Sequence, residues 1–183
     1  ENGARVLNAS WGGASNLPAL LEAINAAGDA GVPFVCSAGN SGRDNDKEDH
    51  YPSNFASPTL IAVGSTNNAD SRYTSSNYGK ITVDLAAPGA SIHSVTINGG
   101  YISRSGTSMA TPFVTGAIAL LAGLAPDASA MELKQWTLDG VDPLPAWENL
   151  SVTGGRLNLS RSLEYLRIDW FEPELRIGAL EAE

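Results

Sequence analysis

The chain has 183 residues, of which 43% are hydrophobic and 17% are charged, a composition typical of a globular protein with a sizeable core. Its formal net charge of −9 at pH 7 argues against nucleic acid or an anionic membrane surface as a partner, because both attract basic proteins. No apolar run approaches the roughly 20 residues needed to cross a bilayer. Since the chain does not begin with Met, we expect it to be a processed or truncated piece of a longer protein.

The first part of the chain predicts a strand, a helix and a second strand. Residues 6–13 (VLNASWGG) begin as an apolar strand and end in a glycine turn. Residues 17–30 carry apolar side chains at helical spacing, and Asn16 is the expected helix cap. Residues 32–38 predict a buried strand that contains the single cysteine, Cys36, which we expect to be unreactive. A right-handed crossover would make the two strands parallel, with their carboxyl ends at the edge where α/β sheets bind ligands.

The middle of the chain predicts two more buried strands and a hairpin. Residues 41–49 are polar and rich in charge, which is typical of a solvated loop. Residues 60–64 and 81–86 are apolar and are predicted to be strands. Residues 91–103 predict a hairpin that turns at the Asn-Gly-Gly of residues 98–100.

A segment of small residues, GTSMATP at residues 106–112, runs directly into an apolar helix at residues 113–124. Because apolar side chains occur nearly all round this helix, we predict that it is buried at the centre of the molecule. Ser108 lies in its first turn, where free N–H groups and the helix dipole favour developing negative charge, as at a nucleophile. The alternative for such a position is a Ser or Thr that merely caps a core helix.

The last part of the chain predicts two helices. Residues 129–138 are amphipathic, and residues 160–166 follow as a final helix. Together the elements predict an α/β fold with a mostly parallel sheet and a buried central helix. Residues 167–183 match no expected element, and we interpret them as a tail or the start of a further segment.

Several of these segments resemble the subtilisin-like serine proteases, or subtilases. GTSMATP resembles the nucleophile segment of that family, and VCSAGNSG at residues 35–42 resembles the loop whose Asn side chain stabilises the oxyanion. YTSSNYG at residues 73–79 is similar to a surface segment of the family, and GGRLNL at residues 154–159 to its closing segment. The resemblance implies a three-layer subtilisin-like fold, in which residues 1–166 are the C-terminal portion of a peptidase domain with an incomplete N-terminal part.

The resemblance also implies roles for individual residues. Ser108 would be the nucleophile that forms the acyl-enzyme, and the Asn40 side chain would donate a hydrogen bond to the oxyanion of the tetrahedral intermediate. The implied substrate-binding residues, which pair with the substrate or wall the pocket for the residue before the scissile bond, are Ser10, Trp11, Gly12, Ala38, Gly39 and His50.

The placement of His50 follows from the Tyr51-Pro52 pair, which aligns with the Tyr-Pro that comes after the binding pocket in the family. This alignment puts His50 near the pocket floor, with Asp49 beside it. An acidic residue at the floor would favour a basic side chain before the cut.

The chain departs from the family in lacking a recognisable general base. The family order along the chain is Asp, His and Ser, but the family's upstream Asp-x-Gly and His-Gly-Thr segments have no counterpart here. His50 and His93 are the two histidines, neither is followed by glycine, and we interpret both as loop or surface residues. The aspartate, the histidine and their flanking strands are therefore expected from residues before Glu1 or from another chain. Alone, the chain should be inactive, with exposed strand edges on one side of its sheet.

The expected function is that of a serine endopeptidase acting on a peptide or protein substrate. One alternative is a subtilase-like binding domain that natively lacks the base, and another is a peptide cyclase or transpeptidase that uses the same acyl-enzyme. No cofactor is expected to be required. In some relatives an Asp at the position of Asp84 holds calcium or sodium, which makes Asp84 a weak candidate for a structural calcium site. The resemblance also implies a secreted or cell-surface protein.

Overall fold

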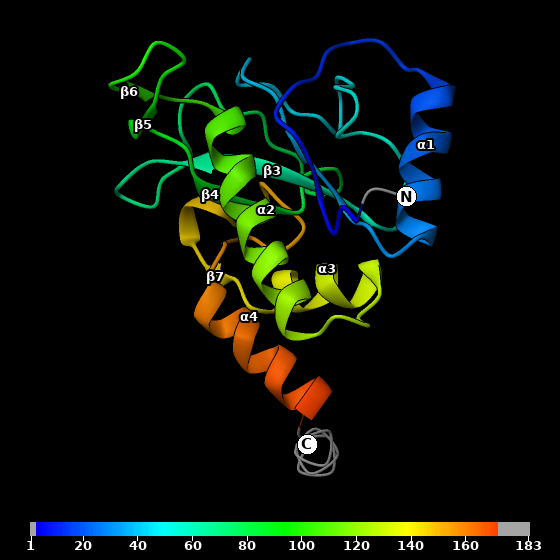
Figure 1. The fold of residues 1–183 in the computed structure, drawn as a ribbon. Helices are drawn as coiled ribbons and strands as arrows, with labels where there is room; N and C mark the ends of the chain where they lie inside the picture. Colours follow the sequence, from blue (N-terminus) through cyan, green and yellow to red (C-terminus); the bar gives the residue numbers. More distant parts are fainter. Residues whose placement is uncertain (1–2, 172–183) are drawn as a thin grey trace.

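The computed structural model describes residues 3–171, which are organised around a six-stranded sheet (Figure 1). The strands lie in the order β1-β2-β3-β4-β8-β7. Their bounds are β1 (Leu7–Ala9), β2 (Phe34–Ser37), β3 (Leu60–Thr66), β4 (Leu85–Pro88), β7 (Asp142–Pro143) and β8 (Gly155–Arg156). Neighbouring strands are parallel except for β7, which pairs antiparallel with β8. The predicted α/β class with a mostly parallel sheet is therefore confirmed.

Side chains of the central strands alternate between two apolar layers. Phe34 and Cys36 of β2 pack with Ile24 of α1 (Pro18–Asp29) on one face of the sheet. Val35, between them, packs on the other face with residues of α2 (Thr107–Leu124). A parallel sheet that is covered on both faces explains why its strands read as continuous apolar runs. The same burial raises the pKa of the Cys36 thiol, which agrees with the expectation that it is unreactive.

The strands β1 and β2 and the helix between them form the predicted unit, with Leu7 opposite Phe34 in parallel register. The helix begins at Pro18, whose fixed φ angle suits a first helical position. The prediction that Asn16 caps this helix is wrong, because its Nδ2 donates to the Tyr51 hydroxyl at 3.1 Å instead. The two strands nevertheless end side by side, at the edge of the sheet where the expected site residues lie.

Helix α2 crosses the sheet and packs against β1, β2, β3 and β4 (Figure 1). Val114, Ile118 and Leu121 are fully buried on the side that faces the sheet. The prediction that this helix is buried is confirmed for that side alone, since Phe113, Leu120 and Leu124 are 44%, 47% and 49% exposed. An 18-residue apolar helix such as α2 could by length and composition also cross a membrane, but here it is the core helix of the α/β layers.

Between β4 and α2 the chain forms the predicted hairpin, with β5 (Ile92–Val95) antiparallel to β6 (Tyr101–Arg104). The strand predicted at residues 81–86 instead begins at Leu85 as β4. The reason is a distant carboxylate: Asp46 accepts hydrogen bonds from the backbone N–H groups of Ile81 and Thr82, which hold those residues in a turn.

The C-terminal part covers one end of the core with two helices, α3 (Ala130–Asp139) and α4 (Leu159–Leu166), and a short 3-10 turn (Pro145–Trp147). Ser129 and Glu132 form a capping box that starts α3. The chain continues from α4 into one π-helical turn, Arg167–Phe171, in which Asp169 accepts a hydrogen bond from the Trp136 indole at 2.8 Å. The beginning of the segment predicted as a tail therefore packs on the core, and residues 172–183 lie outside the described part of the chain.

Strand β1 lies at one end of the sheet, and within residues 3–171 its strand pairing is with β2 alone. Leu7 in this strand is 36% exposed. The structure thus has the exposed strand edge that was expected on one side of the sheet.

Candidate active site

Ser108 lies in the first turn of α2, next to the carboxyl end of β1. Its hydroxyl donates to the Ser10 carbonyl at 3.1 Å, and the Ser10 hydroxyl donates to the Ser108 carbonyl at 2.9 Å. Gly106 precedes the helix with a φ of 141°, a conformation that favours glycine. Two segments 98 positions apart in the sequence are thereby held together at the edge of the sheet.

Asn40 follows β2 and is oriented by the same helix start. Its Oδ1 accepts hydrogen bonds from the Thr107 backbone N–H at 2.8 Å and from the Thr107 hydroxyl at 3.1 Å. The Thr107 hydroxyl in turn accepts from the Gly39 backbone N–H at 3.3 Å. Because Oδ1 is held in this way, the Nδ2 group is the part of the Asn40 side chain that can donate to a ligand.

Two asparagines that the sequence reasoning missed form hydrogen bonds with the loop that contains Asn40. Asn77 is buried, and its Oδ1 accepts from the backbone N–H groups of Ser41 and Arg43 at 2.8 and 3.1 Å. Its Nδ2 donates to Asn45, whose own Nδ2 donates to the Ala38 carbonyl at 2.8 Å. Both lie in segments that were predicted to be solvated or at the surface, and that expectation is wrong for them. No local pattern distinguishes these asparagines from turn formers, since their partners are distant in sequence.

The expected substrate-binding residues come from two neighbouring strand ends. Ser10, Trp11 and Gly12 follow β1, and Ala38 and Gly39 follow β2. The His50 ring lies between these two segments: a Cβ atom added to Gly12 would lie 2.3 Å from its Cε1, and one added to Gly39 would lie 3.0 Å from its Nε2. The structure therefore brings all six residues together.

The His50 imidazole is half-buried and has one defined partner. Its Nδ1 lies 3.2 Å from the Ser53 hydroxyl, which donates its own proton to the His50 carbonyl at 2.6 Å. With the Ser53 proton on that carbonyl, Nδ1 carries the hydrogen, and the Nε2 lone pair then faces Gly12 and Gly39. Burial lowers the pKa of His50, so the neutral ring is the form that occupies this gap at neutral pH.

Asp49 points away from that gap. Its carboxylate accepts from the Tyr51 hydroxyl at 3.0 Å and from the Asn54 Nδ2 at 3.3 Å, on the exposed side of the loop. The hydrogen bond to Asp49 also raises the pKa of the Tyr51 hydroxyl. The interpretation that Asp49 supplies a negative charge at the pocket floor has no support in this geometry.

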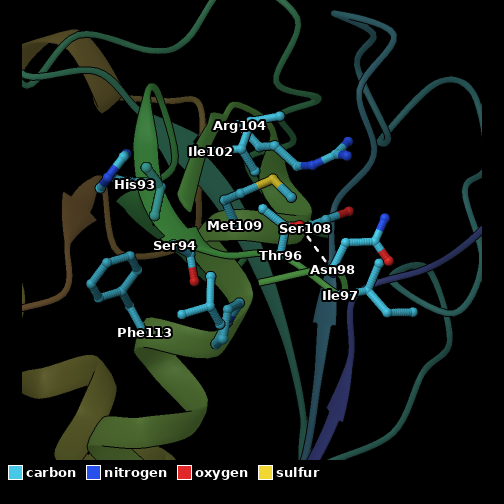
Figure 2. A pocket seen from close by; sticks show the side chains of 13 residues that line it. His93, Ser94, Thr96, Ile97, Asn98, Ile102, Arg104, Ser108, Met109 and Phe113 are labelled. Carbon is cyan, nitrogen blue, oxygen red and sulfur yellow. Dashed lines mark hydrogen bonds between the residues drawn. The ribbon is translucent and has the colours of Figure 1, made fainter. Parts of the chain in front are cut away.

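Within residues 3–171, neither histidine is hydrogen-bonded to Ser108. The His50 ring is bonded to Ser53, as described above. His93 lies on β5, where it stacks on Tyr101 with ring centroids 5.3 Å apart and contacts the Ser103 hydroxyl at 3.3 Å. Figure 2 places its ring across the pocket from Ser108. In the described part of the chain, neither imidazole is therefore placed to act as a base for Ser108.

A cavity of about 830 Å³ opens beside Ser108, between the β5–β6 hairpin and the start of α2 (Figure 2). Most of the side chains that line it are apolar, and they include Ile92, Val95, Ile97, Ile102, Met109 and Phe113. Several of these side chains are strongly exposed, with Ile97 at 99%. Clusters of exposed apolar side chains of this kind are typical of surfaces that bind a substrate or another protein segment.

Asp84 does not fit a calcium site, because a lysine already neutralises it. The Lys134 ammonium lies 3.1 Å from Asp84 Oδ1 and donates to the Leu60 carbonyl at 2.5 Å, while Asp84 Oδ2 accepts from the Ala62 backbone N–H at 2.7 Å. Calcium requires six to eight oxygen ligands, and an ammonium among them would repel it. Nor do the described residues contain any group of three or more His, Cys, Asp or Glu placed to hold a metal ion.

The chain is similar in sequence to bacterial serine proteases. Thermitase from Thermoactinomyces vulgaris is 40% identical over 129 residues, which are 70% of this chain and 44% of thermitase. Subtilisin DY from Bacillus licheniformis is 37% identical over 135 residues, which are 73% of this chain and 48% of that protein. The chain spans about half the length of these relatives.

Solved structures agree. Proteases from Pseudoalteromonas arctica superpose with a TM-score of 0.82 at 28% identity, over 91% of this chain and 52% of the matched chain. The prenylagaramide maturation protease PagA gives a TM-score of 0.79 at 28% identity, over 90% of this chain and 63% of its own. The sequence model of the Subtilase family matches residues 1–159. The match covers both the Asn40 loop and the Ser108 helix, and on this evidence the chain belongs to the Subtilase family.

Proposed function

We propose that the chain is the nucleophile-bearing half of a serine endopeptidase, with Ser108 as the residue that forms the acyl-enzyme. The observation that carries the proposal is the way Thr107 orients Asn40. It leaves the Asn40 amide N–H groups beside the helix start on which Ser108 lies. An amide donor and a nucleophile at one helix N-terminus are the parts that acyl transfer requires.

In the proposed mechanism, the Ser108 oxygen attacks the scissile carbonyl carbon and its proton passes to a general base. The resulting oxyanion is bound by the Asn40 Nδ2 group and the Ser108 backbone N–H, which stabilise the tetrahedral intermediate more than the planar substrate. The base returns the proton to the leaving amine, and water then hydrolyses the Ser108 ester. In subtilisin, removing the corresponding Asn donor costs about 10²–10³ in turnover, and we expect a similar loss for Asn40→Ala.

The base and its orienting carboxylate would come from a segment upstream of Glu1 that covers the open side of this structure. Three features support that placement: the unpaired edge of β1, the exposed stripe of α2, and the apolar cavity beside Ser108. The end of β1 and the cavity adjoin Ser108, and the matched relatives are about twice as long as this chain. A segment seated there would bring its histidine to the Ser108 hydroxyl.

A fluorophosphonate probe tests the proposal directly, because an activated serine displaces fluoride from phosphorus and keeps the phosphonyl group. We expect labelling at Ser108 in the longest protein that contains this chain, located by mass spectrometry, and none in the present chain alone. Ser108→Ala in the longer protein is the control and should abolish both labelling and peptide hydrolysis. Proteolysis that persists in this variant would refute the proposal.

Two other activities are compatible with the same geometry. A binding domain without a base would give no labelling in either protein. A cyclase or transpeptidase would be labelled, but its product would lack the added water, since an amine and not water would attack the Ser108 ester. The structural likeness to PagA, which is named a maturation protease, makes product mass the measurement that separates these activities. By family resemblance, we further propose that the protein is secreted or displayed at the cell surface.

A further inference from the structure

We propose that His50 limits the side chain before the scissile bond to a small one, such as that of Gly, Ala or Ser. This inference rests on the proposed function, since it concerns the gap between residues 10–12 and 38–39, where the side chain before the scissile bond would bind. It replaces the earlier interpretation, in which an acidic residue at the same place selects a basic side chain.

The His50 ring fills the space between the two pocket walls, the segments that contain Gly12 and Gly39. Nε2 and Cδ2 would lie 3.0 Å from a Cβ on Gly39, and Cε1 would lie 2.3 Å from a Cβ on Gly12. The ring therefore leaves no space for a Cβ atom on Gly12 and almost none for one on Gly39. A side chain that enters between these walls meets the imidazole after only a few atoms.

The His50 ring is also held in place. Tyr51, the next residue, exchanges two backbone hydrogen bonds with Gly13, at 2.7 and 2.8 Å. Since Gly13 follows directly after Gly12, the backbone at His50 is tied to one pocket wall. The bond from Nδ1 to the Ser53 hydroxyl then fixes the ring itself. A large substrate side chain would have to break this bond and displace the ring.

The residues around this gap offer no negative charge to a basic substrate side chain. The ring is neutral at neutral pH, and the Asp49 carboxylate is engaged by Tyr51 and Asn54 on the outer side of the loop. Selection by this pocket would therefore act through size and not through attraction of Arg or Lys.

The experiment compares peptide substrates that differ only in the residue before the scissile bond, cleaved by the longest protein that contains this chain. We expect kcat/KM for Ala to exceed that for Phe and Arg by roughly 10- to 100-fold, the range that the fit of one side chain supplies. His50→Gly should remove the preference for Ala by raising kcat/KM for Phe by a similar factor, with His50→Ala giving a smaller gain. Thermal unfolding of each variant shows that it folds.

Asp49→Asn is the matched control, because it changes the neighbouring residue and removes the only competing charge argued for. It should leave the order of substrates unchanged. The inference is overturned if the unsubstituted protein cleaves after Phe or Arg as fast as after Ala, or if both His50 variants keep its order. Absence of any Ser108-dependent cleavage would overturn the proposed function itself, which is a different result.

Discussion

At the scale of single residues, the site depends on Thr107 as much as on Ser108 and Asn40, the two residues that the sequence motifs predicted. Thr107 is fully buried, and its hydroxyl both donates to Asn40 and accepts from Gly39. The sequence reasoning identified Ser108 and Asn40 by their similarity to family motifs, but hydrogen bonds between loops 67 positions apart cannot be deduced from either motif alone. The same limit applies to Asn77 and Asn45, whose partners come from other loops.

Thr107→Val tests this role, because it keeps the shape of the side chain and removes the hydroxyl. We expect kcat in the longer protein to fall about tenfold with little change in KM, the equivalent of one ordinary hydrogen bond. The chain alone should lose about 1–3 kcal/mol in its free energy of unfolding, since the Gly39 N–H is left without its partner. Thr107→Ser keeps the hydroxyl and is the control. Equal kcat values for the Val and Ser variants would contradict the assignment.

At the scale of elements, periodicity predicted the strands and helices well, but not where they are covered. The pattern of α2 is apolar on every side, yet a single sheet covers only the stripe that contains Val114, Ile118 and Leu121. The start of β4 was also missed, because Asp46 holds the residues before it in a turn. Both errors have one cause. Contacts with residues distant in sequence, and not local patterns, decide which face of a helix is covered and where a strand begins.

Lys134 joins α3 to the sheet in a way that no local pattern indicates. Its ammonium links Asp84, which precedes β4, to the Leu60 carbonyl at the start of β3. The side chains of Lys134 and Asp84 are both largely buried. Burial raises the pKa of Asp84 even though Lys134 opposes this effect. The carboxylate therefore depends on the ammonium as its counter-charge.

Lys134→Met should cost about 3–5 kcal/mol of unfolding free energy, because it keeps the apolar stem and leaves a buried carboxylate without a partner. Urea unfolding measures this loss, and adding Asp84→Asn to the variant should recover part of it. Lys80→Met is the control, since Lys80 is exposed and such changes stay within about 0.5 kcal/mol.

We also expect the unsubstituted chain to unfold at the same temperature in calcium as in EDTA. A clear rise in calcium would mean that a metal binds after all.

At the scale of the whole molecule, one part of the structure is covered by packed strands and helices, and another part, the open side at the β1 edge and along α2, is exposed. The covered part was predictable, since alternating strands and helices specify an α/β sheet and its ligand-binding edge. For the open side, the sequence predicted only that a segment carrying the base is missing. Its shape, with an apolar cavity beside the nucleophile and an exposed stripe along α2, required the structure.

Two adjacent leucines on α2 test whether this side is covered in the longer protein. Leu120 is 47% exposed in this chain and Leu121 is fully buried. Leu120→Gln should change the stability of the chain alone by no more than about 0.5 kcal/mol, and should reduce its self-association in light scattering. In the longer protein the same substitution should cost roughly 2–3 kcal/mol, since the side chain would be covered there. Leu121→Gln should destabilise both proteins. Equal effects of Leu120→Gln in the two proteins would mean that the face stays exposed.

The paired hydrogen bonds between Ser108 and Ser10 bear on why this part of a catalytic domain would be inactive by itself. The Ser108 proton is held by a backbone carbonyl, in a bond with a net value of only about 0.5–1.5 kcal/mol. An arriving imidazole would displace that carbonyl easily, because it offers a stronger acceptor to the same hydroxyl. The inactivity expected of this chain alone would therefore reflect a base that is not in place, and not a serine hydroxyl that is blocked.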